Sequence, residues 1–200
     1  MIQNIVFDLG NVLVKFDPAY FLKDYPDSEK ELFYKEIFGS ENWLKMDRGA
    51  LSEQELINLV KSRLPLRYHS DAEKLIKWYT LTLEIQGMEP LIRQLKKNGY
   101  SIYLLSNTSP AFHRFCKQIA ALKYFDGLLI SADCGFLKPE KEIFRLFCQK
   151  FSLAPNECVF IDDMPVNIQG AIGEGFAGIV FTGDVPALKE ELAKLGIVTE

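Results

Sequence analysis

The chain has 200 residues, of which 48% are hydrophobic and 25% charged, and these are the proportions of an ordinary globular protein. A chain of this length buries roughly 70% of the surface that it exposes when unfolded, which is enough for one core and a smaller attached domain. Its formal net charge of −4 disfavours nonspecific binding to nucleic acid or anionic lipid, so neither is expected as a partner.

Neither a secretory leader nor a disulfide framework is indicated by the sequence. The N-terminus has no basic stretch followed by a long apolar segment. The four cysteines are scattered without the CxxC spacing of metal sites and redox motifs. We therefore expect a cytoplasmic protein that has no membrane association and whose cysteines are reduced.

Short apolar runs bounded by turn residues predict five buried strands. The runs are Ile5 to Phe7, Ile102 to Leu105, Leu128 to Ile130, Val159 to Ile161 and Ile179 to Phe181. Helical patterns lie between them, at Pro90 to Lys97 and at Pro139 to Phe151. This alternation predicts an α/β core with a doubly wound parallel sheet.

Residues 15–87 interrupt this alternation, because they contain no convincing buried strand. Three S-x-x-E patterns, each typical of a helix N-terminus, precede apolar residues at helical spacing there. They pair Ser28 with Glu31, Ser52 with Glu55, and Ser70 with Glu73. The sequence therefore predicts a helical insert at 15–87, which we call the cap, and a discontinuous core made of 1–14 and 88–200.

Polar side chains follow three of the predicted strands at their carboxyl ends. Asp8 follows the first strand, Ser106 the second, and Asp162 and Asp163 the fourth. Ligands of open parallel sheets bind beyond this edge, so the four side chains are expected to converge on one site. Taken singly, each has an ordinary structural explanation as a turn residue or as the N-cap of a helix.

Five short segments, read in order, resemble the haloacid dehalogenase-like superfamily: FDLGNV at 7–12, LLSN at 104–107, LKPE at 137–140, FIDD at 160–163, and Asn167. The order and the strand-end placement of these segments carry the resemblance, which covers almost the whole chain. It implies a Rossmann-like core with a mobile cap over the active site. It also implies removal of phosphate groups through an aspartyl-phosphate.

The resemblance implies that Asp8 is the nucleophile and that Ser106, Asn107 and Lys138 bind the phosphate group. The local sequence favours the same roles. Free N–H groups at a helix expected to begin near Pro110 suit a phosphate. Lys138 precedes another predicted helix start, where a cation is disfavoured, and this indicates a bound anion. The alternative for Ser106 is the N-cap of a helix, and the alternative for Lys138 is a solvated surface position.

A magnesium ion is the cofactor that the resemblance implies. Its ligands would be Asp8, the backbone carbonyl of Gly10 and Asp163, with Asp162 as the supporting position. Magnesium prefers oxygen ligands, which fits this set. Asn167 stands where the family usually has an aspartate, and it would lower the negative charge near the metal.

Gly10 departs from the family pattern, because most phosphatases of the superfamily have at this position an aspartate that acts as general acid and base. Such help is typically worth roughly 10²- to 10⁴-fold in rate. Either the substrate has a weakly basic leaving group, as an anomeric sugar phosphate has, or a cap residue supplies the proton, and Asp47 is the candidate. Trp43 and Arg48 are candidate substrate contacts. The alternative for Trp43 is a position in the apolar core of the cap. The alternatives for Arg48 are a surface position and an ion pair with a neighbouring acid.

The function predicted from the sequence is magnesium-dependent hydrolysis of a small phosphomonoester, with a sugar phosphate as the favoured substrate. A phosphomutase is an alternative, because Gly10 can slow hydrolysis of the intermediate. A non-catalytic binding or regulatory protein with the same fold is another. A haloacid dehalogenase is disfavoured by the Asp162-Asp163 pair, since that reaction needs no metal.

Overall fold

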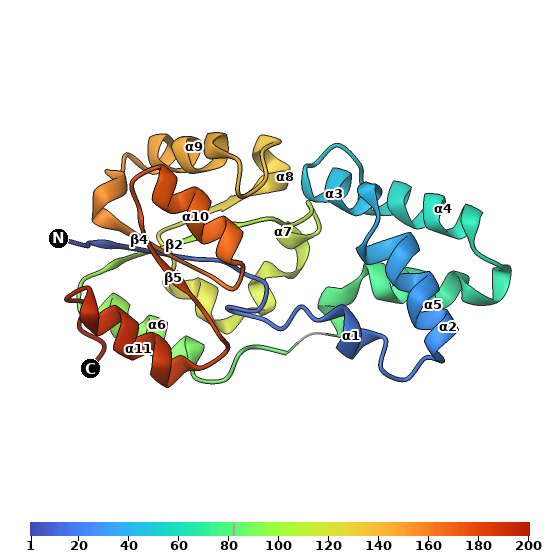
Figure 1. The fold of residues 1–200 in the computed structure, drawn as a ribbon, viewed down its shortest axis with the longest axis horizontal. Helices are drawn as coiled ribbons and strands as arrows, with labels where there is room; N and C mark the ends of the chain where they lie inside the picture. The colour runs from blue at the N-terminus through green and yellow to red at the C-terminus, as the bar shows by residue number, and fades with distance from the viewer. Residues whose placement is uncertain (82) are drawn as a thin grey trace.

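The described part of the chain, residues 1–81 and 83–200 of a computed structural model, is built around a five-stranded sheet with helices on both faces (Figure 1). The strands are β1 (Asn4–Phe7), β2 (Ser101–Ser106), β3 (Gly127–Ile130), β4 (Cys158–Asp162) and β5 (Ala177–Val180). All neighbouring strands are parallel, in the order β3-β2-β1-β4-β5. The predicted doubly wound α/β core is thus confirmed.

Side chains of β1 alternate between two apolar cores on opposite faces of the sheet. Ile5 and Phe7 belong to the core that includes the buried sides of α6 (Met88–Lys97) and α11 (Val185–Lys194). Val6 belongs to the core built on α9 (Lys141–Phe151) and α10 (Pro165–Gly173). Because both faces are covered, the strands are continuous apolar runs and not alternating ones.

The remaining elements of the core are short. They are the single-turn helices α7 (Phe112–Phe115) and α8 (Ser131–Cys134) and the 3-10 turns η4 (Cys116–Gln118), η5 (Ala120–Tyr124) and η6 (Pro155–Glu157). No helix in the described part of the chain combines the length and the apolar character that a membrane crossing requires.

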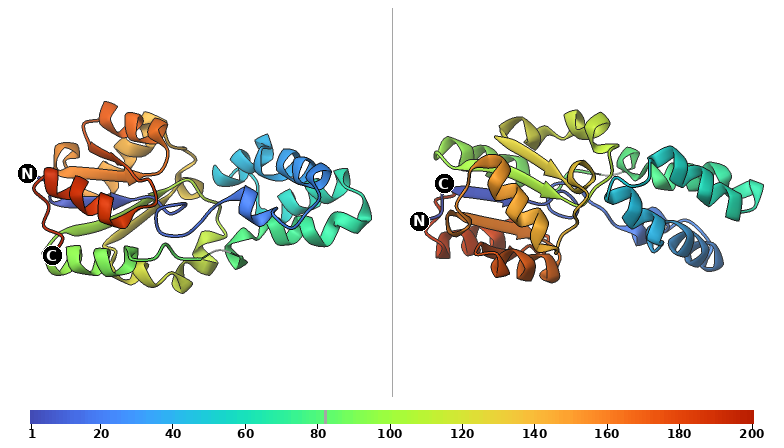
Figure 2. Two further views of the ribbon diagram at one scale, coloured as in Figure 1. Left: turned by 60° about the horizontal axis from the view of Figure 1, so that its bottom comes forward. Right: turned by 90° about the horizontal axis from the view of Figure 1, so that it is seen from above.

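The helices between β1 and α6 form a second body beyond the carboxyl ends of the strands (Figures 1 and 2). They are α1 (Pro18–Phe21), α2 (Asp27–Phe33), the π-helical turn η1 (Tyr34–Phe38), α3 (Glu41–Asp47), α4 (Glu53–Arg63), η2 (Leu66–Tyr68), α5 (His69–Ile76) and η3 (Trp78–Thr80). We keep the name cap for this body. The division of the chain at 14/15 and 87/88 itself stays a prediction.

One of the three predicted capping boxes forms as expected. Ser52 precedes α4, its hydroxyl accepts a hydrogen bond from the Glu55 N–H at 3.2 Å, and the Glu55 carboxylate accepts one from the Ser52 N–H at 2.8 Å. These reciprocal bonds satisfy two N–H groups that have no partner within the helix.

The other two boxes are wrong, because the helices begin before the serines. α2 begins at Asp27, so Ser28 lies inside its first turn. At Ser70 the 3-10 turn η2 continues directly into α5, which begins at His69. The N-cap positions are held by Pro26 and Tyr68 instead of the serines, and no side chain caps either helix.

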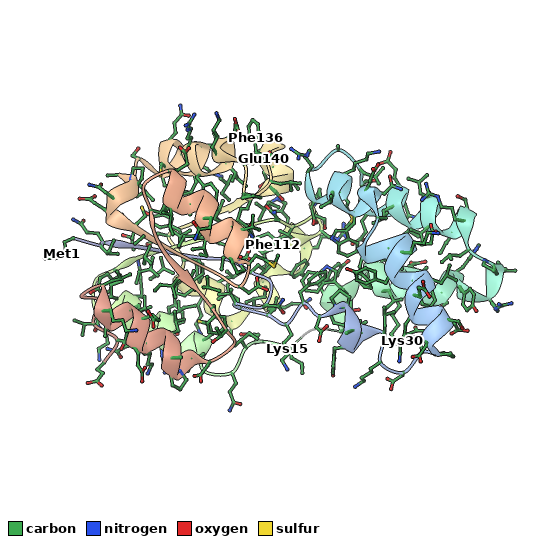
Figure 3. All side chains as sticks on the ribbon, viewed as in Figure 1. Met1, Lys15, Lys30, Phe112, Phe136 and Glu140 are labelled. Atoms are coloured by element: carbon green, nitrogen blue, oxygen red, sulfur yellow. The ribbon has the colours of Figure 1, made fainter. Side chains whose placement is uncertain are left out.

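The turn after α3 presses the cap against the core. Gly49 has a left-handed backbone with φ +75°, and a Cβ at this position would overlap the carbonyl oxygen of Ala132 in α8. Beside it, the Arg48 guanidinium donates to the Gly135 carbonyl at 3.0 Å and to the Glu140 carboxylate at 3.1 Å. Glu140 lies at the edge of the core that faces the cap (Figure 3). Close backbone contact and one ion pair therefore hold this turn in place.

We expect Gly49→Ala to lower the free energy of unfolding more than Gly99→Ala does. Both glycines are left-handed, so both substitutions incur a backbone cost of about 1 kcal/mol. Only at Gly49 does the new methyl group meet backbone atoms, which adds roughly 1–3 kcal/mol. Urea unfolding of the two variants measures the difference, and equal losses would contradict close docking of the cap.

Candidate active site

The carboxyl ends of β1, β2 and β4 bring together the polar side chains predicted to form a site. Asp8, Asp162 and Asp163 each place a carboxylate oxygen within 4.8 Å of the others. Ser106, the last residue of β2, lines the same cavity as Asp8 and Asp163. The adjacent parallel strands therefore create a cluster of three acidic groups beside a hydroxyl group.

Lys138 is buried inside this cluster. Its Nζ lies 2.7 Å from Asp8 Oδ1 and 2.6 Å from Asp162 Oδ2, and it donates a hydrogen bond to the Leu105 carbonyl at 3.1 Å. Burial lowers the pKa of Lys138, but the two carboxylates more than offset this and hold it above its ordinary value. The helix start on which the inference of a bound anion was based is wrong, because α9 begins only at Lys141, and the two carboxylates already pair the charge of Lys138.

Asp162 supports the cluster from behind the cavity wall. Besides Lys138, it accepts a hydrogen bond from the Met164 N–H at 2.8 Å, and the Asn167 amide donates to both of its oxygens at 3.1 Å. An ionised aspartate at 167 could not donate in this way. The alternative explanation of Asp163 as a helix cap is wrong, since Met164 is the N-cap of α10 and no side chain caps it.

The charges of the cluster fit a divalent cation. Asp8 Oδ1 is buried, and beyond its ion pair with Lys138 it accepts no well-directed hydrogen bond from the described residues. Burial raises the pKa of Asp8 to about 6, although Lys138 lowers it, and burial also raises the pKa of Asp163. Three carboxylates against one ammonium group leave excess negative charge on oxygen atoms, and oxygen is the ligand that Mg²⁺ prefers.

Asn11 fixes the position of Asp163, and sequence reasoning missed it. Its amide donates to Asp163 Oδ2 at 3.0 Å, and its Oδ1 accepts from the Phe16 N–H at 2.9 Å. The backbone of Asn11 is left-handed, with φ 55°, a conformation that asparagine tolerates better than most residues. An asparagine directly after the glycine of FDLGNV was the available signal.

A cavity of about 250 Å³ lies between the strand ends and the cap. The core side contributes polar groups, among them Asp8, Ser106, Lys138 and Asp163. The cap side contributes Phe16, Trp43, Asp47 and Trp78. The cavity thus has one charged wall and one mostly aromatic wall.

Asp47 reaches the cavity from the end of α3. The Thr108 N–H donates a hydrogen bond to the Ser131 hydroxyl at 3.0 Å. This hydroxyl in turn donates to the Asp47 carbonyl at 2.5 Å. Burial raises the pKa of Asp47 to about 7; a hydrogen bond from Trp43 lowers it and the nearby Asp8 raises it. Ser131 was missed from the sequence, although it directly follows a predicted strand, as Asp8 does.

Arg48 does not reach the cavity. Its guanidinium is engaged by Glu140 and by the Gly135 carbonyl, and it is absent from the described residues that line the cavity. The alternative of an ion pair with an acidic neighbour is therefore the observed arrangement, and the substrate contact predicted for Arg48 finds no support. Trp43 does line the cavity, although 93% of its surface is covered.

Asn107 lines the cavity but uses its amide on the protein itself. Its Oδ1 accepts from the Lys138 N–H at 2.8 Å, and its Nδ2 donates to the Lys138 carbonyl at 3.0 Å. The helix expected near Pro110 is only the single turn α7, too short to offer the N-terminal phosphate site that was predicted. Asn107 therefore orients the segment that carries Lys138.

Comparison with known proteins agrees with this fold and site. A family model of haloacid dehalogenase-like hydrolases matches residues 2–175, and the chain belongs to that family. It is a phosphatase-like hydrolase of the family, since its curated relatives include phosphatases. A sesquiterpene phosphatase of Aspergillus oryzae is 26% identical, over 92% of this chain and 92% of its own length. A D-ribitol-5-phosphate phosphatase of Bacteroides thetaiotaomicron is 30% identical, over 84% of this chain and 86% of its own.

Solved structures show the same architecture. A crystal structure of a family enzyme from Bacteroides thetaiotaomicron, in complex with magnesium and inorganic phosphate, superposes with a TM-score of 0.75. The two chains are 22% identical, and the match covers 94% of this chain and 99% of the other. At this identity the likeness shows the fold, which is the Rossmann-like core with its helical addition.

We expect Asp8→Asn to stabilise the metal-free protein at pH 7.5. A folded-state pKa raised from 3.8 to about 6 means that ionised Asp8 destabilises the native state, by an amount on the order of 3 kcal/mol above pH 6. The gain should vanish below about pH 4, where Asp8 is protonated in both states. Thermal melts in chelator across this pH range measure it.

Two further observations accompany that measurement. Mg²⁺ should raise the melting temperature of the wild type more than that of Asp8→Asn, because binding to the native state alone stabilises it. Asp24→Asn, which changes an exposed carboxylate, is the matched control and should show neither effect. A variant Asp8→Asn that is less stable than the wild type at every pH would contradict the burial argument.

Proposed function

We propose that the protein hydrolyses a small phosphomonoester in a magnesium-dependent reaction, with Asp8 as the nucleophile. The observation that carries the proposal is the position of Asp8, which lies at a strand end, faces the cavity between the core and the cap, and is paired with a buried ammonium group. Such a carboxylate can attack a phosphorus atom held against the charged wall.

The residues divide the chemistry as follows. An Asp8 oxygen forms a bond to phosphorus while the bond from phosphorus to the ester oxygen breaks, and water then hydrolyses the aspartyl-phosphate. Lys138 offsets the charge of Asp8 and Asp162, and Ser106 offers its hydroxyl to a phosphate oxygen. Asp8, Asp163 and the carbonyl of Gly10 would hold Mg²⁺, which supplies positive charge against the phosphate dianion.

The substrate predicted from the sequence, a sugar phosphate, stays a prediction. One relative is named for a sugar alcohol phosphate and another for a sesquiterpene, and these leaving groups differ in almost every chemical property. The names therefore support phosphomonoester hydrolysis but do not identify the leaving group, which has to be inferred from the chemistry of the cavity.

Phosphate release from p-nitrophenyl phosphate, with Mg²⁺ or with chelator, tests the proposed reaction. We expect turnover that requires the metal and that falls by about 10⁴-fold or more in Asp8→Asn, because the nucleophile is removed. The thermal melts described above show whether that variant is folded. No release from any ester by folded, metal-loaded wild type would instead support the phosphomutase or the non-catalytic alternative.

We further propose that Asp47 supplies the proton that Gly10 cannot. Asp47 lines the cavity opposite Asp8, and a carboxyl group whose pKa is about 7 is protonated in part of the molecules at neutral pH. A general acid works best when its pKa is near the working pH. The protonated form would donate to the ester oxygen as the bond to phosphorus breaks.

We expect Asp47→Asn to lower kcat/KM for alkyl phosphates by roughly 10²- to 10³-fold and for p-nitrophenyl phosphate far less, because nitrophenolate leaves without a proton. In the wild type, kcat/KM for alkyl phosphates should fall as the pH rises above about 7, where Asp47 loses its proton. This decline should be absent from the variant. Rates measured from pH 5 to 9 on both substrate types test the assignment.

Restoring an aspartate at position 10 provides the matched control. Gly10 is not left-handed, and a Cβ there would meet only the Phe16 Cβ, at an ordinary 3.5 Å. Gly10→Asp added to Asp47→Asn should recover alkyl phosphatase activity, whereas Gly10→Asn, of equal size but without an acid, should not. If Gly10→Asp recovers no more activity than Gly10→Asn does, the missing-acid explanation is contradicted.

A further inference from the structure

The aromatic wall of the cavity restricts what the phosphate group can be attached to. Phe16, Trp43 and Trp78 face the space opposite the charged strand ends. We call these three residues the aromatic wall. On the cap side of the described lining, Asp47 is the acidic group. The leaving group of a substrate held at Asp8 would therefore contact mainly aromatic surface.

The rings of the aromatic wall pack around Phe16. The Phe16 ring lies 4.9 Å from the Trp78 ring in an edge-to-face arrangement and 5.9 Å from the Trp43 ring. The backbone of Phe16 is fixed by Asn11 through the 2.9 Å hydrogen bond described above. Trp43 is 93% covered and its ring contacts those of Phe16 and Phe38, so it offers a ligand mainly apolar ring surface.

The cavity also lacks an available cation for a second anionic group. Among the described lining residues, Lys138 is the only lysine or arginine, and its ammonium group is already shared by Asp8, Asp162 and the Leu105 carbonyl. Arg48 is held outside by Glu140. A carboxylate or a second phosphate on the leaving group would be desolvated without a partner, which is costly.

The cavity is small. Its volume of about 250 Å³ lies just below the range of about 300–1,000 Å³ that is usual for small-molecule pockets, and the phosphate group takes part of it. Polyols would also bring several hydroxyl groups against aromatic faces that have few donors or acceptors to meet them. Both facts disfavour large or heavily hydroxylated leaving groups.

We infer that the substrates of this site are monophosphate esters of small, uncharged, apolar alcohols, with a flat or unsaturated group that packs on the aromatic wall. This inference rests on the proposed phosphomonoester hydrolysis and names its substrate class. It departs from the sugar phosphate predicted from the sequence, because only Trp43 of the aromatic wall was expected at the site, and the fold adds Phe16 and Trp78 to it.

Benzyl phosphate and glucose 6-phosphate form the decisive pair of substrates. Both are esters of primary alcohols of similar acidity, so the need for a proton donor is the same and only the group that meets the aromatic wall differs. We expect kcat/KM for benzyl phosphate to be higher by about tenfold or more, the scale on which apolar pockets discriminate. Equal values, or a preference for glucose 6-phosphate, would overturn the inference while leaving the proposed hydrolysis intact.

A substitution in the aromatic wall should change this preference. In Trp78→Leu the ratio of kcat/KM between the two substrates should fall severalfold, because stacking surface is lost. Phe33→Leu is the matched control: Phe33 is fully buried in the cap and its ring contacts Tyr25 and Tyr68 instead of the aromatic wall. An unchanged ratio in a folded Trp78→Leu variant would contradict the role of the aromatic wall.

Tryptophan fluorescence of the wild type gives an independent measurement that needs no variant. The chain has 2 tryptophans, and both line this cavity, so its indole emission reports directly on the aromatic wall. With Mg²⁺ present, benzylphosphonate should shift the emission saturably and bind about tenfold more tightly than methylphosphonate. Equal binding of the two overturns the inference alone. Binding of neither, together with no ester hydrolysis, overturns the proposed function as well.

Discussion

The ammonium group of Lys138 joins the ends of three strands, and the rest of the site depends on it. It contacts Asp8 after β1, the Leu105 carbonyl in β2 and Asp162 at the end of β4, with Lys138 itself almost fully buried. Without this cation, two buried carboxylates would repel each other in a medium of low polarity, and removing the ammonium group would cost roughly 3–5 kcal/mol because both negative charges would lose the positive charge that offsets them. The sheet edge therefore holds two buried carboxylates because the loop before α9 brings a lysine to it.

The core and the cap contribute different chemistry to one cavity. The core supplies charge, through Asp8, Asp163 and Lys138, whereas the cap supplies Asp47 and an apolar wall. Their alignment depends on the turn after α3, which the Ser131 hydroxyl and the Arg48–Glu140 pair hold against the core. That ion pair is partly exposed, and such pairs contribute only about 0–1 kcal/mol. This ion pair therefore orients the turn more than it stabilises it.

Sequence reasoning succeeded where the signal was local and failed where it depended on neighbours in space. Asp8, Ser106 and Asp162 follow apolar runs, and parallel pairing places all such strand ends at one edge of the sheet. Ser28 and Ser70 fit the capping-box pattern equally well, yet helices that begin earlier enclose both. A capping pattern identifies a helix and leaves its first residue undecided, because the start also depends on how the preceding segment packs.

The sequence by itself determined the order of strands and helices, the helical insert and the set of polar residues at the strand ends, since each follows from hydrophobic periodicity and chain order. Tertiary structure alone decided which of those residues line the cavity. It paired Lys138 with two carboxylates, turned Arg48 away to Glu140, and set Trp78 opposite Asp8. The physical reason is that charge pairing and cavity lining depend on distances between residues far apart in the chain, and those distances exist only once the cap has packed on the core.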